Sequence, residues 1–170
     1  MSYLVYGFIQ TCTSSAEFQA DLGSLVEQQL LGMREISAED LHGFPPEHLP
    51  SDLSHTVLFE ITSAKEGWGA EYLLSHLDFA PEVEIGLPLG AKARQALLIS
   101  LLEAMAALPG TEKIYVTIND CNQIEEVKFV SLKDFGPVAR ADFTEEMPPD
   151  VLYIISNCVD SEWREETIRP

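Results

Sequence analysis

The sequence predicts an α+β fold in which a single mixed or antiparallel sheet of about five strands carries two main helices on one face. Two observations indicate this class. Several short segments are rich in β-branched and aromatic residues, and two long segments carry apolar residues at the spacing of a helix. With 170 residues, of which 46% are hydrophobic, the chain is long and apolar enough to bury one core. We therefore expect one domain that spans residues 1–170.

Five segments have the composition of β-strands. They are residues 3–10, 56–62, 113–119, 124–132 and 151–155. The third and fourth segments are separated by residues 120–123, which are polar and include Asp and Asn, so we expect these two strands to pair as a hairpin. In the fourth segment Val127 and Phe129 alternate with Glu126 and Lys128, which is the pattern of a strand with one buried face.

The first long helix is expected to begin after Ser14. Ser14 and Glu17 have the spacing of a capping box, and Phe18, Leu22 and Val26 follow at helical spacing. These apolar residues predict an amphipathic helix with one face turned to the core.

The second long helix is expected over residues 91–108, where the apolar stripe is broad enough to be substantially buried. A short helix is expected over residues 71–77. Residues 37–40 have the pattern of a second helix cap, after which only a turn or two can follow. Residues 43–54 contain three prolines and are expected to form a loop. The acidic stretch between the last two predicted strands, residues 133–150, is expected to be irregular.

The charge of the chain limits what it can bind. It has 28 Asp and Glu against 10 Lys and Arg, for a net charge of −18. Residues 1–85 carry only Arg34 and Lys65 as bases and have a net charge of −12, whereas residues 86–170 have a net charge of −6. Such a field attracts cations and basic proteins and repels phosphate backbones and anionic membranes, so we expect no binding to nucleic acid or membranes.

The cysteines and the apolar segments indicate a cytoplasmic protein. Cys12, Cys121 and Cys158 are odd in number and form no CxxC pair, so we expect reduced thiols in a reducing compartment. The N-terminal apolar run lacks a preceding basic residue and is expected to be a strand instead of a signal peptide. The longest apolar stretch, residues 96–108, is too short to cross a bilayer.

A loop that leads into the second long helix is a candidate anion site. Residues 86–94 place Gly90, Lys92 and Arg94 at the start of this helix, and a helix N-terminus favours phosphate or carboxylate. The segment does not match the GxxxxGK[ST] phosphate-binding pattern. The alternative is that one of the chain's own carboxylates lies beside these cations.

The sequence contains no metal or catalytic motif. His42, His48 and His55 lie close together in the sequence among acidic residues, but their spacing fits no ligand pattern, so we expect no metal and no cofactor. Residues 120–131 lack the glycine and the final glutamate of a calcium loop. The GxSxG, SxxK and GxGxxG patterns are also absent, which favours a protein without enzymatic activity.

These observations favour a small acidic interaction domain that neutralises a basic protein partner, as an immunity or inhibitor protein does. The expected contact surface lies in residues 35–84, which contain many acidic residues and one base, Lys65. The residues chosen for it are Glu39, Asp40, Glu47, Asp52 and Glu66, with Trp68 as an apolar anchor.

Two other hypotheses remain. The chain binds a small anion, as a binding protein or an enzyme, through residues 86–94. Alternatively, the acidity reflects the host, and the protein acts through an apolar oligomer interface. The sequence leaves the oligomeric state open.

Overall fold

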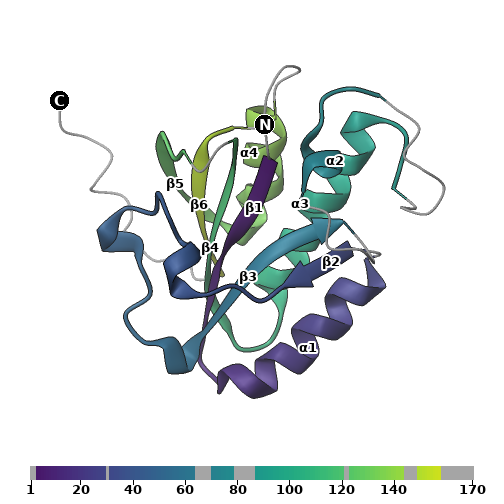
Figure 1. The fold of residues 1–170 in the computed structure, drawn as a ribbon. Coiled ribbons are helices and arrows are strands. Elements are labelled where there is room, and N and C mark those ends of the chain that lie inside the picture. The colour runs from purple at the N-terminus through teal and green to yellow at the C-terminus, as the bar shows by residue number, and fades with distance from the viewer. Residues whose placement is uncertain are drawn as a thin grey trace.

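The centre of the molecule is one mixed sheet of six strands (Figure 1). The computed structural model describes residues 3–29, 31–63, 70–78, 87–120, 123–143 and 149–157. The strands follow the order β2-β3-β1-β4-β6-β5, and all neighbours are antiparallel except β5 and β6. Their bounds are Tyr3–Thr11 for β1, Leu31–Arg34 for β2, Thr56–Ser63 for β3, Thr111–Asp120 for β4, Glu126–Ser131 for β5 and Val151–Ser156 for β6. The expected α+β class with one mixed sheet is confirmed.

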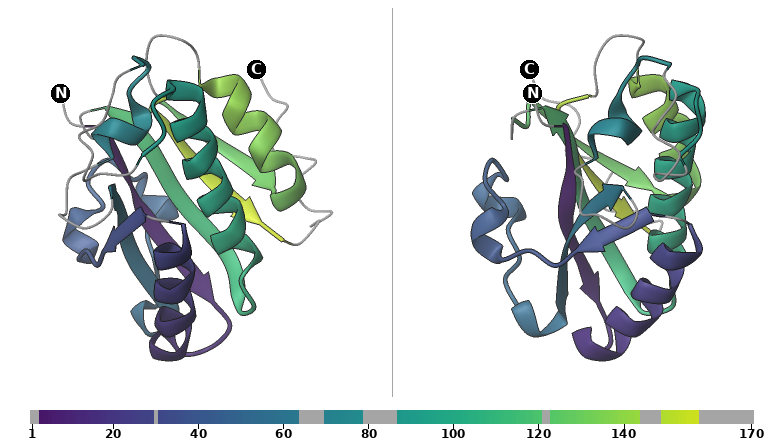
Figure 2. Two further views of the ribbon diagram at one scale, coloured as in Figure 1. Left: turned by 90° about the vertical axis from the view of Figure 1, so that its right-hand side faces the viewer. Right: turned by 45° about the vertical axis from the view of Figure 1, so that its right-hand side comes forward.

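Four helices of the described residues cover one face of this sheet (Figure 2). They are α1 Ser15–Gln28, α2 Glu71–Leu74, α3 Ala91–Ala107 and α4 Leu132–Asp142. The main hydrophobic core lies between these helices and the sheet. The short helix α2 is one turn long and ends before the predicted residue 77.

The two long helices are where the apolar periodicity predicts them. Helix α1 buries Phe18, Leu22 and Val26, and Ser14 is its N-cap residue, although the Ser14 side chain makes no capping hydrogen bond. Helix α3 buries a broad set of residues, which confirms the expected stripe; they include Leu98, Ile99, Leu101, Leu102 and Met105.

The prediction of a hairpin between β4 and β5 is wrong. Strand β6 lies between them: it is antiparallel to β4 and parallel to β5. The reason is α4, which follows β5 directly and lies in a stretch that was expected to be irregular. A helix between two parallel strands is the usual crossover connection, because parallel neighbours cannot be joined by a tight turn.

The second face of the sheet is covered by residues 35–55, which we call the acidic segment. It contains three 3₁₀ turns, Ala38–Asp40, Pro46–His48 and Leu53–His55, and no strand. Figure 2 shows it on the side of the sheet away from the four helices. A second apolar cluster lies beneath it; the buried residues of this cluster are Tyr6, Phe8, Leu41, Phe44, Leu152 and Ile154. The acidic segment is therefore a folded part of the domain.

Candidate functional site

Two buried side chains hold the acidic segment against the sheet. Leu41 and Phe44 are 4% and 6% exposed. The ring of Phe44 lies 5.8 Å from that of Tyr6 and 6.1 Å from that of Phe8, both on β1. The Tyr6 hydroxyl also donates a hydrogen bond of 2.7 Å to the backbone carbonyl of His42. Gly43, between the two anchors, has φ of 83°, a conformation that favours glycine.

Two of the predicted carboxylates fix the turns of this segment. The Asp40 carboxylate accepts hydrogen bonds from the backbone N–H and the hydroxyl of Ser37, at 2.7 and 2.8 Å. The Asp52 carboxylate accepts from the backbone N–H and the hydroxyl of Ser54, at 2.9 and 2.6 Å, and lies 3.1 Å from His55 Nδ1. The short cap predicted at residues 37–40 is thus confirmed.

These hydrogen bonds also affect ionisation. The contacts with Ser37 hold the pKa of Asp40 below its ordinary value, and the contacts with Ser54, followed by His55, do the same for Asp52. Hydrogen bonds to a carboxylate stabilise its charged form. Both groups therefore keep their negative charge to a lower pH than an unperturbed aspartate does.

The outer side of the acidic segment combines charge with apolar surface. Glu39, Asp40, Glu47 and Asp52 are all exposed. Together with Glu35 they give the segment five carboxylates, and it contains no Lys or Arg. Two leucines of the segment, Leu49 and Leu53, are 44% and 55% exposed. Sequence reasoning did not single out these leucines, because apolar residues in a loop do not reveal which of them are buried.

The imidazole of His48 connects the acidic segment to strand β4 and to the edge strand β5. Its ring lies 6.5 Å from that of Tyr115 on β4 and 5.7 Å, edge to face, from that of Phe129 on β5. Phe129 is 43% exposed. His48 therefore joins the acidic segment to the exposed ring of Phe129 on the edge strand β5.

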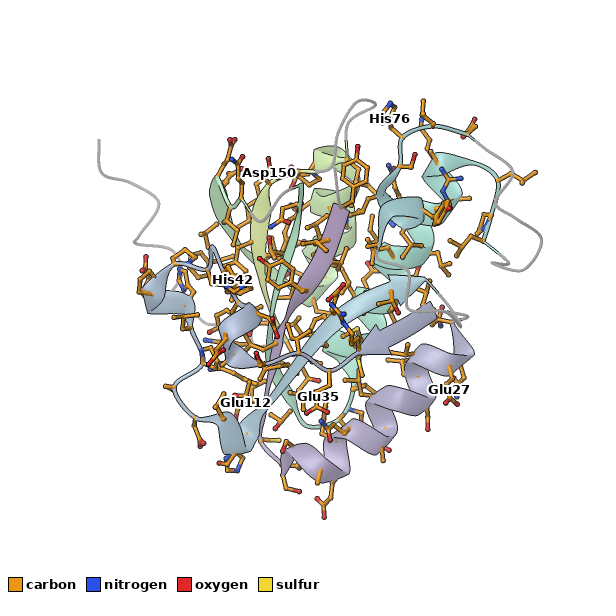
Figure 3. The ribbon with its side chains drawn as sticks, in the orientation of Figure 1. Glu27, Glu35, His42, His76, Glu112 and Asp150 are labelled. Carbon is orange, nitrogen blue, oxygen red and sulfur yellow. The ribbon has the colours of Figure 1, made fainter. Side chains whose placement is uncertain are left out.

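The three histidines of the segment do not come together. Within the ranges that the structure describes, no three His, Cys, Asp or Glu side chains are grouped closely enough to hold a metal ion. In Figure 3, His42 and Glu35 mark the acidic segment, whereas Glu27 on α1 and His76 after α2 lie in other parts of the molecule. Glu66 and Trp68, the remaining predicted contact residues, lie outside the described residues.

The alternative site at the start of α3 has a different geometry from the one expected. Arg94 is fully buried. Its guanidinium donates hydrogen bonds to carbonyl oxygens of the chain: those of Tyr72 at 2.6 Å, Pro88 at 3.1 Å and Ser75 at 3.3 Å, and those of Leu77 and Leu89. Burial lowers the pKa of Arg94, and the charge of Asp78 opposes this shift. Arg94 thus fastens the segments before α3 to the helix through bonds to carbonyl groups of the chain.

Gly90 and Lys92 do border a cavity, of about 460 Å³, together with His76, Asp78 and Phe143. The Asp78 carboxylate accepts a hydrogen bond of 2.7 Å from the backbone N–H of Ala91, the first residue of α3. One of the chain's own carboxylates therefore occupies the helix N-terminus, as the alternative reading of this loop expected.

Comparison with known proteins does not extend this description. Neither protein-family models, nor curated proteins, nor solved structures match the chain. The described helices include none with the length and apolar character that a bilayer crossing requires.

Proposed function

We propose that the protein is an acidic interaction domain of the cytoplasm that binds and neutralises a basic protein, in the manner of an immunity or inhibitor protein. The observation that supports this proposal best is the acidic segment. It holds five carboxylates without a Lys or Arg, and two buried anchors and two capped turns keep it in place on the sheet.

The two kinds of exposed side chain have different roles in this function. The carboxylates attract a basic partner at long range and raise the association rate. Leu49 and Leu53 lose water on contact and slow dissociation, as apolar anchors at the centre of an interface do. Glu66 and Trp68, which lie outside the described residues, stay part of the same proposal on their residue type alone.

The test begins with a pull-down from the native host, with the captured protein identified by mass spectrometry, purified and used in binding kinetics. Glu39→Lys with Glu47→Lys is the informative variant, because no turn-capping hydrogen bond depends on these two carboxylates in the structure. We expect the association rate to fall at least tenfold at low salt, with little change at high salt.

A matched control carries the same change in net charge on another face. Glu17→Lys with Asp21→Lys alters two exposed residues of α1, on the helical side of the sheet. This control should slow association far less. Equal loss in both variants would show that only net charge matters, and recovery of no basic protein would contradict the proposed function.

Binding of a small molecule at the start of α3 is the second candidate, because Gly90 and Lys92 border the cavity there. The Asp78 carboxylate at the helix N-terminus disfavours an anion in that position. A small anion that copurifies with the protein and is lost in Lys92→Ala would support this candidate over the first.

A further inference from the structure

A row of polar side chains crosses the sheet beside the acidic segment. Arg34 on β2 lies directly opposite Glu60 on β3, and Glu60 lies directly opposite Tyr6 on β1. Side chains at directly opposite positions of neighbouring strands extend to the same face of a sheet. Tyr6 belongs to the apolar cluster under the acidic segment, so all three side chains are on that face.

This row lines a small cavity between the sheet and the acidic segment. Its volume is about 190 Å³, and it is bordered by Leu4, Tyr6, Arg34, Ile36, Asp40, His42 and Glu60. Leu4 and Ile36 pack against the apolar cluster and give one side of the cavity an aliphatic character. The Asp40 carboxylate, whose pKa the bonds to Ser37 hold below its ordinary value, adds a second carboxylate beside that of Glu60.

The two side chains of the ion pair in this cavity, Arg34 and Glu60, differ in their exposure to solvent. The Glu60 side chain is only 10% exposed, whereas the Arg34 side chain, which donates to the Glu60 carboxylate, is 65% exposed. A carboxylate that is nine-tenths buried needs a compensating cation. Here the cation comes from the solvent side, on a long side chain near the end of a strand of four residues.

We propose that this cavity is a binding site for an organic cation, an ammonium or guanidinium group on a short aliphatic chain. The cationic head bonds to Glu60 in place of the Arg34 guanidinium, which moves into solvent, and the aliphatic chain lies against Leu4 and Ile36. Guanidinium and carboxylate groups are complementary in shape as well as charge, and the internal pair shows that the site accepts such a head.

A cation of this kind can come from two sources. One is a Lys or Arg side chain of the basic partner, and in that case the inference rests on the proposed function. The other is a free small cation. Both share the cationic head and the aliphatic chain, so one probe tests the site itself.

The probe is agmatine, which carries a guanidinium and an ammonium group on a four-carbon chain, and binding is measured by calorimetry and by thermal unfolding. Arg34→Ala removes the internal competitor. We expect agmatine to bind this variant at least tenfold more tightly than the wild type and to raise its unfolding temperature more. Butylurea, which has the same chain length and no charge, should not bind.

Two further variants make the result specific. Arg34→Ala with Glu60→Gln should lose the binding, because the buried carboxylate is gone. Arg34→Ala with Glu17→Gln should retain it, because Glu17 is an exposed carboxylate of α1, on the other side of the sheet, that does not border this cavity. If Arg34→Ala does not fold, Arg34→Met replaces it in every single and double variant, because methionine keeps the aliphatic part of the side chain.

Absence of saturable agmatine binding to the Arg34 variant, or binding that survives Glu60→Gln, would overturn the inference. The partner distinguishes the two sources. A partner that binds Glu60→Gln at least tenfold more weakly places its own side chain in the cavity, whereas unchanged partner affinity together with agmatine binding assigns the cavity to a free cation. The proposed function fails separately, if Glu39→Lys with Glu47→Lys leaves association with the partner unchanged.

Discussion

Single residues of this protein show how the fold overrides what their chemical type suggests. Arg94 is charged and lies in the first turn of a helix, which suggested a ligand contact, yet it is fully buried and bonded to five carbonyl oxygens. These acceptors come from residues 5 to 22 positions earlier in the chain. No local pattern reveals such a set, so the burial of Arg94 could not be predicted from the sequence.

Gly7 provides a prediction at this scale. A Cβ atom added at Gly7 would lie 1.9 Å from the backbone oxygen of Tyr115 on β4. Neither backbone can move without disturbing the pairing of β1 with β4, so Gly7→Ala should lower the free energy of unfolding by about 1–3 kcal/mol or more. Urea unfolding measures the effect.

Gly23 is the matched control, because a Cβ atom added there, within α1, meets no atom within 4 Å. Gly23→Ala should be neutral or stabilise by up to about 1 kcal/mol, since alanine favours a helix more than glycine does. Equal effects of the two variants would contradict the close approach at Gly7.

At the scale of helices and strands, the sequence predicted an element correctly where its apolar residues recur over several turns. It did not predict which strands pair, because the paired strands can lie far apart in the sequence. Helices α1 and α3 were found because their apolar residues recur over several turns. Strand β2, with four residues, is too short to show a pattern. Helix α4 contains Gly136 and Pro137, both poor helix formers, which concealed it. The hairpin between β4 and β5 was wrong because strand pairing depends on the path of the chain between the strands.

The candidate site was predictable to a similar degree. The charge of Glu39, Asp40, Glu47 and Asp52 was sufficient to place them on the surface. Their arrangement on capped turns over an apolar cluster was only partly visible, through the Ser37 cap. The cavity beside Glu60 depends on β2, which was not predicted, and so it was not foreseen.

The end of α4 is attached to the sheet by two hydrogen bonds to Asp142. Lys128 Nζ on β5 donates a 2.6 Å hydrogen bond to the Asp142 carboxylate at the end of α4, and the buried Tyr153 hydroxyl on β6 donates to the same carboxylate at 2.7 Å. The hydrogen bond to Asp142 raises the pKa of Lys128, and burial, followed by the hydrogen bond to Asp142, raises the pKa of Tyr153.

A pH dependence follows from the sign of these shifts. Groups whose pKa is higher in the folded state stabilise it fully below their unfolded pKa of about 10, and this contribution is lost as the pH rises above that value. We therefore expect the free energy of unfolding to fall between about pH 9.5 and 11.5, and to fall less steeply in Lys128→Met. Chemical unfolding across this range measures both slopes, and parallel curves would show that these hydrogen bonds do not contribute.

For the whole molecule, the net charge predicts a repulsion that depends on salt. A net charge of −18 on 170 residues opposes the compact state. Added NaCl screens this repulsion, because the Debye length decreases from about 30 Å at 0.01 M to about 10 Å at 0.1 M ionic strength. The unfolding temperature should therefore rise between these two concentrations at pH 7. A constant or lower unfolding temperature would mean that attractive ion pairs outweigh the repulsion.

The manner in which the acidic segment is attached has a consequence for evolution. It forms no strand of the sheet, and it is held by Leu41, Phe44, the Tyr6 hydrogen bond and the ring of His48. Exposed positions that neither cap a turn nor need a glycine conformation, such as Glu39 and Glu47, are expected to tolerate change without altering the sheet or the four helices. Under the proposed function, a scaffold of this kind would allow recognition to diverge while the fold stays constant, so descendants of one ancestral chain would come to bind different targets.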